Sequence, residues 1–253
     1  MNSLPVAVLV FACVFGGGLA GLALHGKLPE HHQDSDSKEV VKLIMGLIAT
    51  VSALVLGLLI YSARIAFTTQ ESEVQQVGAS IGQLDHALAL YGPETAEART
   101  LLRQVVASEL KRIWSIDSDA AVEPGAGSTR NAADELADRI AGLSPGTETQ
   151  QRAKSRAQQL LEQTGVTRRL LYEQSNSLLS WMFLAVMVSW LVALFVGYGF
   201  LTRYNATVVA AMLVGAFCVS GAIFLILDMN RPYTGLMQIS SAPIRNALDR
   251  NVR

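Results

Sequence analysis

Four stretches without ionisable side chains limit what this chain can fold into more than any other feature. No Asp, Glu, Lys, Arg or His occurs in residues 1–24, 43–63, 174–202 or 204–227. A helix rises about 1.5 Å per residue, so about 20 apolar residues cross a hydrocarbon core of about 30 Å. A single stretch of this kind would also suit a buried core helix. Four of them in one chain of 253 residues favour four membrane spans.

The composition agrees with this prediction, since 51% of the residues are hydrophobic, only 16% are charged and the mean hydropathy is +0.33. Backbone groups in lipid must be satisfied within a helix or a closed barrel, and no period-two alternation indicates a barrel. We therefore predict an all-α integral membrane protein with four transmembrane helices and a helical cytoplasmic insert between spans two and three. Membrane lipid is the expected partner. Nucleic acid is not, because the net charge is -1 and no basic patch stands out.

The spans divide the chain into four regions. They are residues 1–67, with spans one and two and a polar loop at 25–42; residues 68–177, the insert; residues 178–228, a hairpin of spans three and four; and residues 229–253, a C-terminal tail. An even number of spans puts the insert and both termini on one face. A small excess of arginines near the span ends predicts that this face is cytoplasmic, in the inner (plasma) membrane of a cell. The first stretch has no Lys or Arg before it, so we interpret it as a retained span and not a signal peptide.

The insert has a helical pattern with clear breaks. Apolar residues recur at helical spacing from Val77 to Tyr91, where Gly92-Pro93 ends one helix and starts another that closes near Trp114. Residues 116–131 are typical of a surface loop. From Thr147 onward the helical period continues toward span three, which predicts one long helix from the insert into the membrane.

No constellation for catalysis is visible: there is no nucleophile beside a base, no paired carboxylates and no phosphate cradle. We therefore expect no enzyme activity, no catalytic residue and no cofactor. The loop residues His25, His31, His32 and Asp34 are possible metal ligands by type. Adjacent histidines rarely point the same way and loop histidines are usually solvated, so we predict no metal site. The run at residues 16–18 is interpreted as glycines for close helix packing or a bend, not as a nucleotide loop.

Several short strings along the chain resemble the bacterial bestrophin-like family of membrane proteins. The matching strings are Leu28-Pro29 with His31-His32, Val40–Lys42, Gly46–Thr50, Ala53–Leu59, Leu84-Asp85, Tyr91–Glu94, Asn205–Thr207, Gly221–Leu225, Asn230–Tyr233 and Ser241–Pro243. They extend over almost the whole chain. The resemblance implies a further likeness to true bestrophins, which are pentameric anion channels with four spans, cytoplasmic termini and a helical cytoplasmic region.

In bestrophins the second span lines the pore and narrows to an apolar neck. The resemblance places Thr50, Leu54 and Leu58 at this neck. Two departures limit the resemblance to bestrophins. No aspartate-rich segment follows Pro232-Tyr233, so calcium gating is not implied. In addition, Ile65–Phe67 differs from the usual continuation of the pore helix. Ion selectivity therefore stays open.

Span two also has small residues on one side, which are Gly46, Ala49, Thr50, Ala53 and Gly57. Small residues let helix backbones approach closely in lipid, and we favour this packing role over pore lining for Ala49, Ala53 and Gly57. Thr50, Leu54 and Leu58 lie along one edge of that side, where an apolar constriction is a known gating device.

Arg64 ends span two and Asp228 ends span four, both at the same predicted membrane face. Ionisable groups at that depth are costly unless they are paired or hydrated, which makes an ion pair between these two side chains a reasonable hypothesis. The alternative is that each one reaches the lipid headgroups independently.

Two functions fit these observations. The first is a homo-oligomeric ion channel, pentameric by the resemblance, that passes small anions along a pore lined by span two. The alternative is a membrane-anchored sensor or scaffold protein that signals through its cytoplasmic helices. The second draws on the long helix predicted from Thr147 and on the lack of ionisable residues in the middle of the spans.

Overall fold

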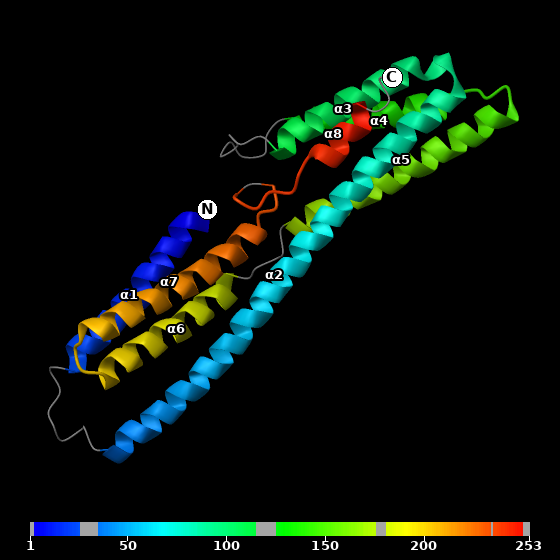
Figure 1. Ribbon diagram of the computed structural model, residues 1–253. Coiled ribbons are helices and arrows are strands. Elements are labelled where there is room, and N and C mark those ends of the chain that lie inside the picture. Colours follow the sequence, from blue (N-terminus) through cyan, green and yellow to red (C-terminus); the bar gives the residue numbers. More distant parts are fainter. Residues whose placement is uncertain (1–2, 26–34, 115–124, 176–180, 234, 250–253) are drawn as a thin grey trace. The chain divides into compact units, whose positions relative to one another are not determined.

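The computed structural model describes residues 3–25, 35–114, 125–175, 181–233 and 235–249, and every regular element in these ranges is helical (Figure 1). The elements are α1 (Ser3–His25), α2 (Ser35–Tyr91), the short 3-10 helix η2 (Pro93–Thr95), α3 (Ala96–Trp114), α4 (Gly125–Ala141), α5 (Glu148–Ser175), α6 (Trp181–Leu201), α7 (Ala206–Met229) and α8 (Ala242–Asp249). In the described part, α1, α2, α6 and α7 are long and apolar enough to cross a membrane. The prediction of an all-α chain with four such helices is confirmed.

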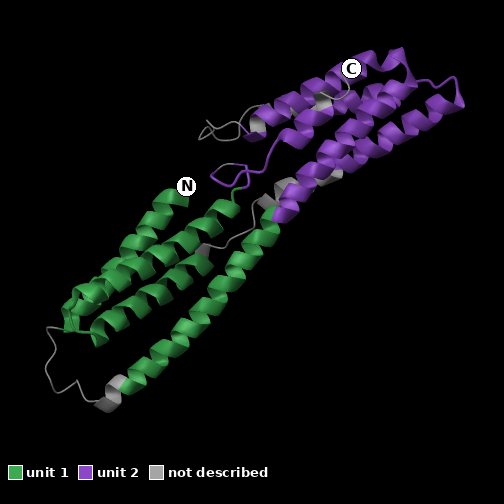
Figure 2. Cartoon of the chain, in the orientation of Figure 1, with its two compact units in different colours: residues 1–67, 177–231 green, residues 68–176, 232–253 purple. Residues whose placement is uncertain are grey.

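The helices form two compact units, coloured separately in Figure 2. Unit 1 comprises residues 1–67 and 177–231, and unit 2 comprises residues 68–176 and 232–253. Unit 1 contains α1, α6, α7 and the first part of α2. Unit 2 contains the last part of α2 together with α3, α4, α5 and α8. The C-terminal segment after α7 thus belongs with the helices of the insert.

In unit 1, α1 packs against both α6 and α7. The His25 ring nitrogen Nδ1 donates to the carbonyl oxygen of Phe200 at 2.8 Å, so the ends of α1 and α6 lie together and these two helices run parallel. Ser3 Oγ donates to Asp228 Oδ1 at 3.3 Å, so the start of α1 lies beside the end of α7. Their shared core is apolar, and its buried residues are Val6, Val10, Val14, Leu184, Met187, Leu191, Ala216 and Ile223.

Glycines bring the backbones of α1 and α6 into direct contact. A Cβ added at Gly21 would lie 2.1 Å from the carbonyl oxygen of Val196, and one at Gly199 would lie 2.3 Å from that of Gly18. A Cβ at Gly17 would lie 3.1 Å from Val192. Helices in lipid associate mainly through such close packing, because lipid tails are as apolar as the side chains they would replace. The packing interpretation of the glycine run is therefore confirmed for two of its members, Gly17 and Gly18.

The second span is longer than predicted. The sequence separates a span ending at Phe67 from a helix beginning near Val77, whereas α2 is one helix of 57 residues from Ser35 to Tyr91. The nine residues between the two predicted helices contain neither Pro nor Gly, so nothing in the backbone chemistry interrupts the helix. Hydropathy falls after Phe67, but this fall marks a change in what surrounds the helix and not the end of the helix.

The turn after α2 follows the prediction closely. Gly92 adopts a φ of 134°, a conformation that favours glycine, and Pro93 starts η2 directly afterwards. The buried Thr95 hydroxyl donates to the carbonyl oxygen of Leu88 at 2.6 Å, which satisfies an acceptor left at the end of α2. From there α3 runs to Trp114, where the sequence predicts its end.

The core of unit 2 comes from α2, α3, α4 and α5, and its largest fully buried side chains include Leu84, Leu88, Leu136, Ile140 and Leu160. The segment after α7 is held by Trp114, whose Nε1 donates to the carbonyl oxygen of Ile239 at 2.8 Å. The Trp114 ring also meets the edge of Tyr233 at a centroid distance of 5.2 Å. These contacts attach the C-terminal segment to α3.

Two predicted boundaries in the insert differ from the structure or lie outside it. The loop predicted at 116–131 is too long at its C-terminal end, because α4 already begins at Gly125. Glycine and serine suggested a loop there, but the alanines that follow favour a helix and extend it back to Gly125. The predicted continuity of the helix from Thr147 with span three falls on residues 176–180, outside the described residues.

Candidate functional site

The part of α2 in unit 1 has two opposite faces. One face is buried or half-buried against the rest of the unit, and its members are Met45, Ser52, Leu56, Leu59 and Ala63. The other face is exposed along its length, and its members are Leu43, Leu47, Thr50, Leu54, Leu58, Tyr61 and Ile65. At about 100° per residue the centres of the two faces are about 180° apart.

This exposed face makes α2 different from the other three candidate spans. Only 11% of the most apolar stretch of α2 is buried, against 39% for α1 and 28% each for α6 and α7. A three-helix cluster of α1, α6 and α7 therefore carries most of the packing in unit 1, and α2 attaches to it along one side. Half of the helix surface is left for lipid or for other copies of the chain.

The three residues predicted to line a pore all lie on the exposed face. Leu54 and Leu58 are 66% and 59% exposed. Thr50 is also exposed, and its hydroxyl donates to the carbonyl oxygen of Gly46 at 2.9 Å, one turn earlier in the same helix. Because the hydroxyl hydrogen of Thr50 is already bonded within the helix, only the oxygen remains available, as a hydrogen-bond acceptor for groups outside the helix. The other residues of the exposed face are apolar apart from the Tyr61 hydroxyl.

Of the residues predicted to pack closely in α2, Ala49 is half-buried, but Ala53 and Gly57 do not show this role among the described residues. A Cβ added at Gly46 or Gly57 would meet nothing within 4 Å among the described residues, and Ala53 is exposed. Gly57 and Ala53 therefore do not bring α2 close to α1, α6 or α7. The reason is their position: at about 100° per residue they lie about 80° to 120° around α2 from the side that carries Met45 and Ala63. Sequence periodicity identified a face of small residues but not the direction in which it points.

The buried face of α2 contacts α6 at Gly197. A Cβ at Gly197 would lie 2.6 Å from the end of the Met45 side chain, so the glycine makes room for the methionine. Ser52 is 2% exposed and its Oγ makes no hydrogen bond among the described residues. Nothing in the sequence separates Ser52 from the other serines.

Arg64 and Asp228 differ in solvent exposure. Asp228 is buried, with 1% of its surface exposed, and it accepts the hydrogen bond from Ser3 described above. Arg64 is exposed on α2. The sequence did not suggest Ser3 as a partner, because 225 residues separate it from Asp228. The ion pair between Arg64 and Asp228 stays a prediction.

The loop considered as a metal site lies mostly outside the described residues, which include His25 but not His31, His32 or Asp34. His25 uses Nδ1 to bond α6, so it connects two helix ends. Within the described ranges, no group of three or more His, Cys, Asp or Glu side chains lies close enough to hold a metal ion.

Unit 2 contains a buried ion pair that sequence reasoning did not identify. Arg99 donates from Nε and Nη2 to the two carboxylate oxygens of Asp85 at 2.8 and 2.9 Å, and the Asp85 side chain is 5% exposed. These hydrogen bonds, assisted by the carboxylate charge, raise the pKa of Arg99 above its ordinary value. The pair joins α2 to α3.

The structure also perturbs Tyr233, which follows α7. Burial raises the pKa of its hydroxyl to about 12, and the negative charge of Glu73 acts in the same direction. The phenol therefore stays protonated over the physiological range. No signal in the sequence points to this environment, because Glu73 and Trp114 come from helices far away in the chain.

Comparison with known protein families gives a match over most of the chain. The family model described as Bestrophin-like domain matches residues 12–244, a range that includes α2, α6, α7 and nearly all of unit 2. No curated protein and no solved structure matches the chain.

Proposed function

The chain belongs to the bestrophin-like family, and from that premise we propose that it forms a homo-oligomeric channel that conducts small anions along a pore lined by α2. Five copies is the number that the likeness to bestrophins implies. The observation that carries the proposal is the exposed, mostly apolar face of α2 opposite its packed face. The same surface is suited to lipid contact, and the experiment below separates the two surroundings.

The chemistry of the exposed face suits a gate more than a binding site. Leu54 and Leu58 are large and apolar, so a ring of several copies of each would exclude water when narrow and admit it when wide. Thr50, one turn earlier, offers hydroxyl oxygens beside the constriction. The glycines and Ala53 on the same half of the helix leave space in which neighbouring copies of α2 approach one another.

Single cysteines distinguish a pore from a lipid surface. In a background with Cys13→Ser and Cys218→Ser, the variants Leu54→Cys and Leu58→Cys would be recorded in planar bilayers before and after a charged, water-soluble thiol reagent. Phe217→Cys is the matched control, because Phe217 is 69% exposed on α7 and would face lipid. Modification at Leu54→Cys or Leu58→Cys should change the current at least severalfold, and modification should not affect Phe217→Cys.

A second pair of variants tests the gate directly. Leu58→Ala shortens the side chain at the proposed constriction and should raise the open probability or the conductance, whereas Phe217→Ala should leave both unchanged. If the purified, assembled oligomer carries no current under any of these conditions, the channel proposal is wrong.

We also propose a location for the protein and an ion pair between Arg64 and Asp228 at the membrane face. The contacts of Ser3 with Asp228 and of His25 with Phe200 identify opposite ends of unit 1. The protein is expected in the inner membrane with the Ser3 end and unit 2 on the cytoplasmic side, which labelling of introduced cysteines in sealed vesicles tests. A double-mutant cycle with Arg64→Gln and Asp228→Asn would measure the coupling of the proposed ion pair.

The alternative is a membrane sensor or scaffold without enzymatic or transport activity. It is favoured by the share of the chain that lies in unit 2 and by the lack of any ionisable side chain in residues 43–63, which would be the middle of the pore helix. A correctly assembled oligomer that is electrically silent and repeatedly co-purifies with one cytoplasmic protein would support it.

A further inference from the structure

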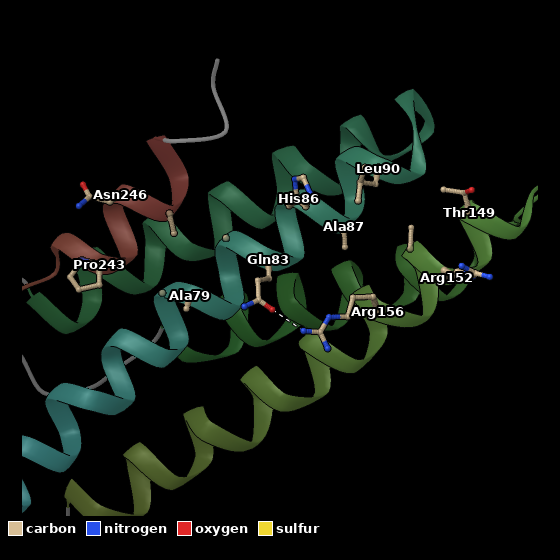
Figure 3. Close-up of a pocket in the computed structure, with 14 residues that line it drawn as sticks. Ala79, Gln83, His86, Ala87, Leu90, Thr149, Arg152, Arg156, Pro243 and Asn246 are labelled. Atoms are coloured by element: carbon tan, nitrogen blue, oxygen red, sulfur yellow. Dashed lines mark hydrogen bonds between the residues drawn. The ribbon is translucent and has the colours of Figure 1, made fainter.

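A cavity of about 850 Å³ lies in unit 2 between α2, α5 and α8 (Figure 3). Its size falls within the range of about 300 to 1,000 Å³ typical of sites for small organic ligands. All of its lining residues belong to unit 2, so it is separate from the proposed pore face of α2. Nothing in the family match assigns a ligand to this cavity.

Small residues shape the cavity by setting how close α8 approaches α2. A Cβ added at Gly78 would lie 2.9 Å from the carbonyl carbon of Pro243, so this glycine lets the start of α8 reach the α2 backbone. One turn later, a Cβ at Gly82 would lie 3.7 Å from the Cβ of Ala247, an ordinary contact. Ala79 and Ala153 line the remaining space and do not fill it.

The charged side chains of the lining are all basic. Arg152 and Arg156 come from α5, and no Asp or Glu is among the lining residues. Arg156 donates from Nη2 to Gln83 Oε1 at 2.8 Å and from Nη1 to Gln159 Oε1 at 3.0 Å. Both acceptors are neutral amides, so these bonds orient the guanidinium without neutralising it. Figure 3 draws the bond to Gln83.

Arg152 differs because it pairs with Glu148 one turn earlier in α5. Both side chains of this pair are largely exposed, at 77% and 80%, and such pairs contribute little in water. The cavity wall therefore carries two cations, the oriented Arg156 and Arg152, and both residues are exposed. The rest of the wall is partly apolar, with Leu90 and Pro243 among its members.

We propose that this cavity binds a small, water-soluble organic anion in which an oxyanion group is attached to an apolar body. The planar guanidinium of Arg156 accommodates the two oxygens of a carboxylate or phosphate, which is the geometry in which arginine binds most strongly. The apolar body packs against the alanine, leucine and proline surfaces. Gln83 holds Arg156 in place when no ligand is bound, so it is a positioning residue.

Calorimetric titration of the full-length protein in nanodiscs of neutral lipid tests the proposal. The probes are phenyl phosphate and benzoate, with benzamide as the uncharged probe of similar shape. The two anions should bind at least about tenfold more tightly than benzamide, as expected when one charge-assisted contact is lost. Equal affinity for all three probes would overturn the proposal.

Variants localise the binding. Arg156→Gln should weaken the anions about tenfold or more, and Arg156→Lys should restore part of the loss because it keeps the charge but not the planar geometry. Arg139→Gln is the matched control, since Arg139 on α4 is not among the lining residues. Ala79→Trp should fill the cavity and abolish binding. Unchanged binding in Arg156→Gln or Ala79→Trp contradicts the assignment.

Two further outcomes would identify a different occupant for the cavity and overturn the proposal. Displacement of phenyl phosphate when the nanodiscs contain phosphatidylglycerol would identify a lipid headgroup as the occupant. Dissociation of the oligomer by Ala79→Trp with unchanged anion affinity would identify the cavity as a contact with a second copy of the chain. None of these readouts depends on ion conduction, so they fail or succeed independently of the channel proposal.

Discussion

Replacing Gly21 by alanine should separate α1 from α6. The added Cβ would lie 2.1 Å from the carbonyl oxygen of Val196 and 2.9 Å from its carbonyl carbon. An ordinary contact begins at 3.4 Å, so the two helices must move apart by about 1.3 Å at this point. Backbone atoms cannot rotate away as the end of a side chain can.

The expected loss of stability follows from this displacement. A gap of about 0.5 to 1 Å already removes a quarter to a half of the dispersion energy of the contacts around it. Overpacking of a tight interface typically costs about 1 to 3 kcal/mol. The case here is near the upper end, because the contact is between backbones, and the better helix propensity of alanine offsets at most about 1 kcal/mol. A net destabilisation of about 2 kcal/mol is expected.

The assay is equilibrium unfolding of the purified protein in mixed micelles with increasing denaturing detergent, followed by tryptophan fluorescence. Gly16→Ala is the matched control, because a Cβ there meets nothing within 4 Å among the described residues. Gly16→Ala should be neutral or slightly stabilising, and Gly21→Ala should unfold at a clearly lower detergent fraction. If the two variants unfold together, the glycine contact does not hold α1 against α6.

Two further predictions concern unit 2. Arg99→Met leaves the Asp85 carboxylate buried without its two hydrogen bonds and should destabilise unit 2 by about 2 to 3 kcal/mol, seen as faster amide exchange in α2 and α3, while Arg139→Met should leave this exchange unchanged. The pKa of Tyr233 is about 12 in the folded protein and about 10 in the unfolded chain. Its contribution to the stability of the fold is therefore complete below about pH 10 and is lost as the pH rises toward 12, because the unfolded chain loses the proton first. Alkaline unfolding of Tyr233→Phe should lack this loss, and an identical pH profile in the two proteins would refute the burial of the hydroxyl.

The sequence predicted the spans well because absence of charge is a local property. The first charge-free stretch ends at residue 24, and α1 runs from Ser3 to His25. Asp228 was predicted to end span four, and α7 ends at Met229. The error at α2 has the same origin. Charge marks where the lipid ends, and a helix continues beyond that point when no Pro or Gly cluster breaks it.

The contacts that define the sites were beyond sequence reasoning, because they join residues far apart in the chain. The parallel course of α1 and α6 is visible only from pairs such as His25 and Phe200, which are 175 positions apart. The cavity likewise brings Gly78, Arg156 and Pro243 together from three helices. Periodicity showed that Gly46 and Gly57 share a side of α2, but only packing reveals that neither glycine meets a neighbour among the described residues.

The loose attachment of α2 has a consequence for assembly of the proposed oligomer. In water a row of exposed leucines would force a subunit to aggregate, but hydrocarbon solvates leucine as well as another leucine does. A solitary copy is therefore tolerated in the bilayer. Association then rests on surface fit, and the population of complete rings should depend on the ratio of protein to lipid, falling reversibly as vesicles are diluted by fusion with empty ones.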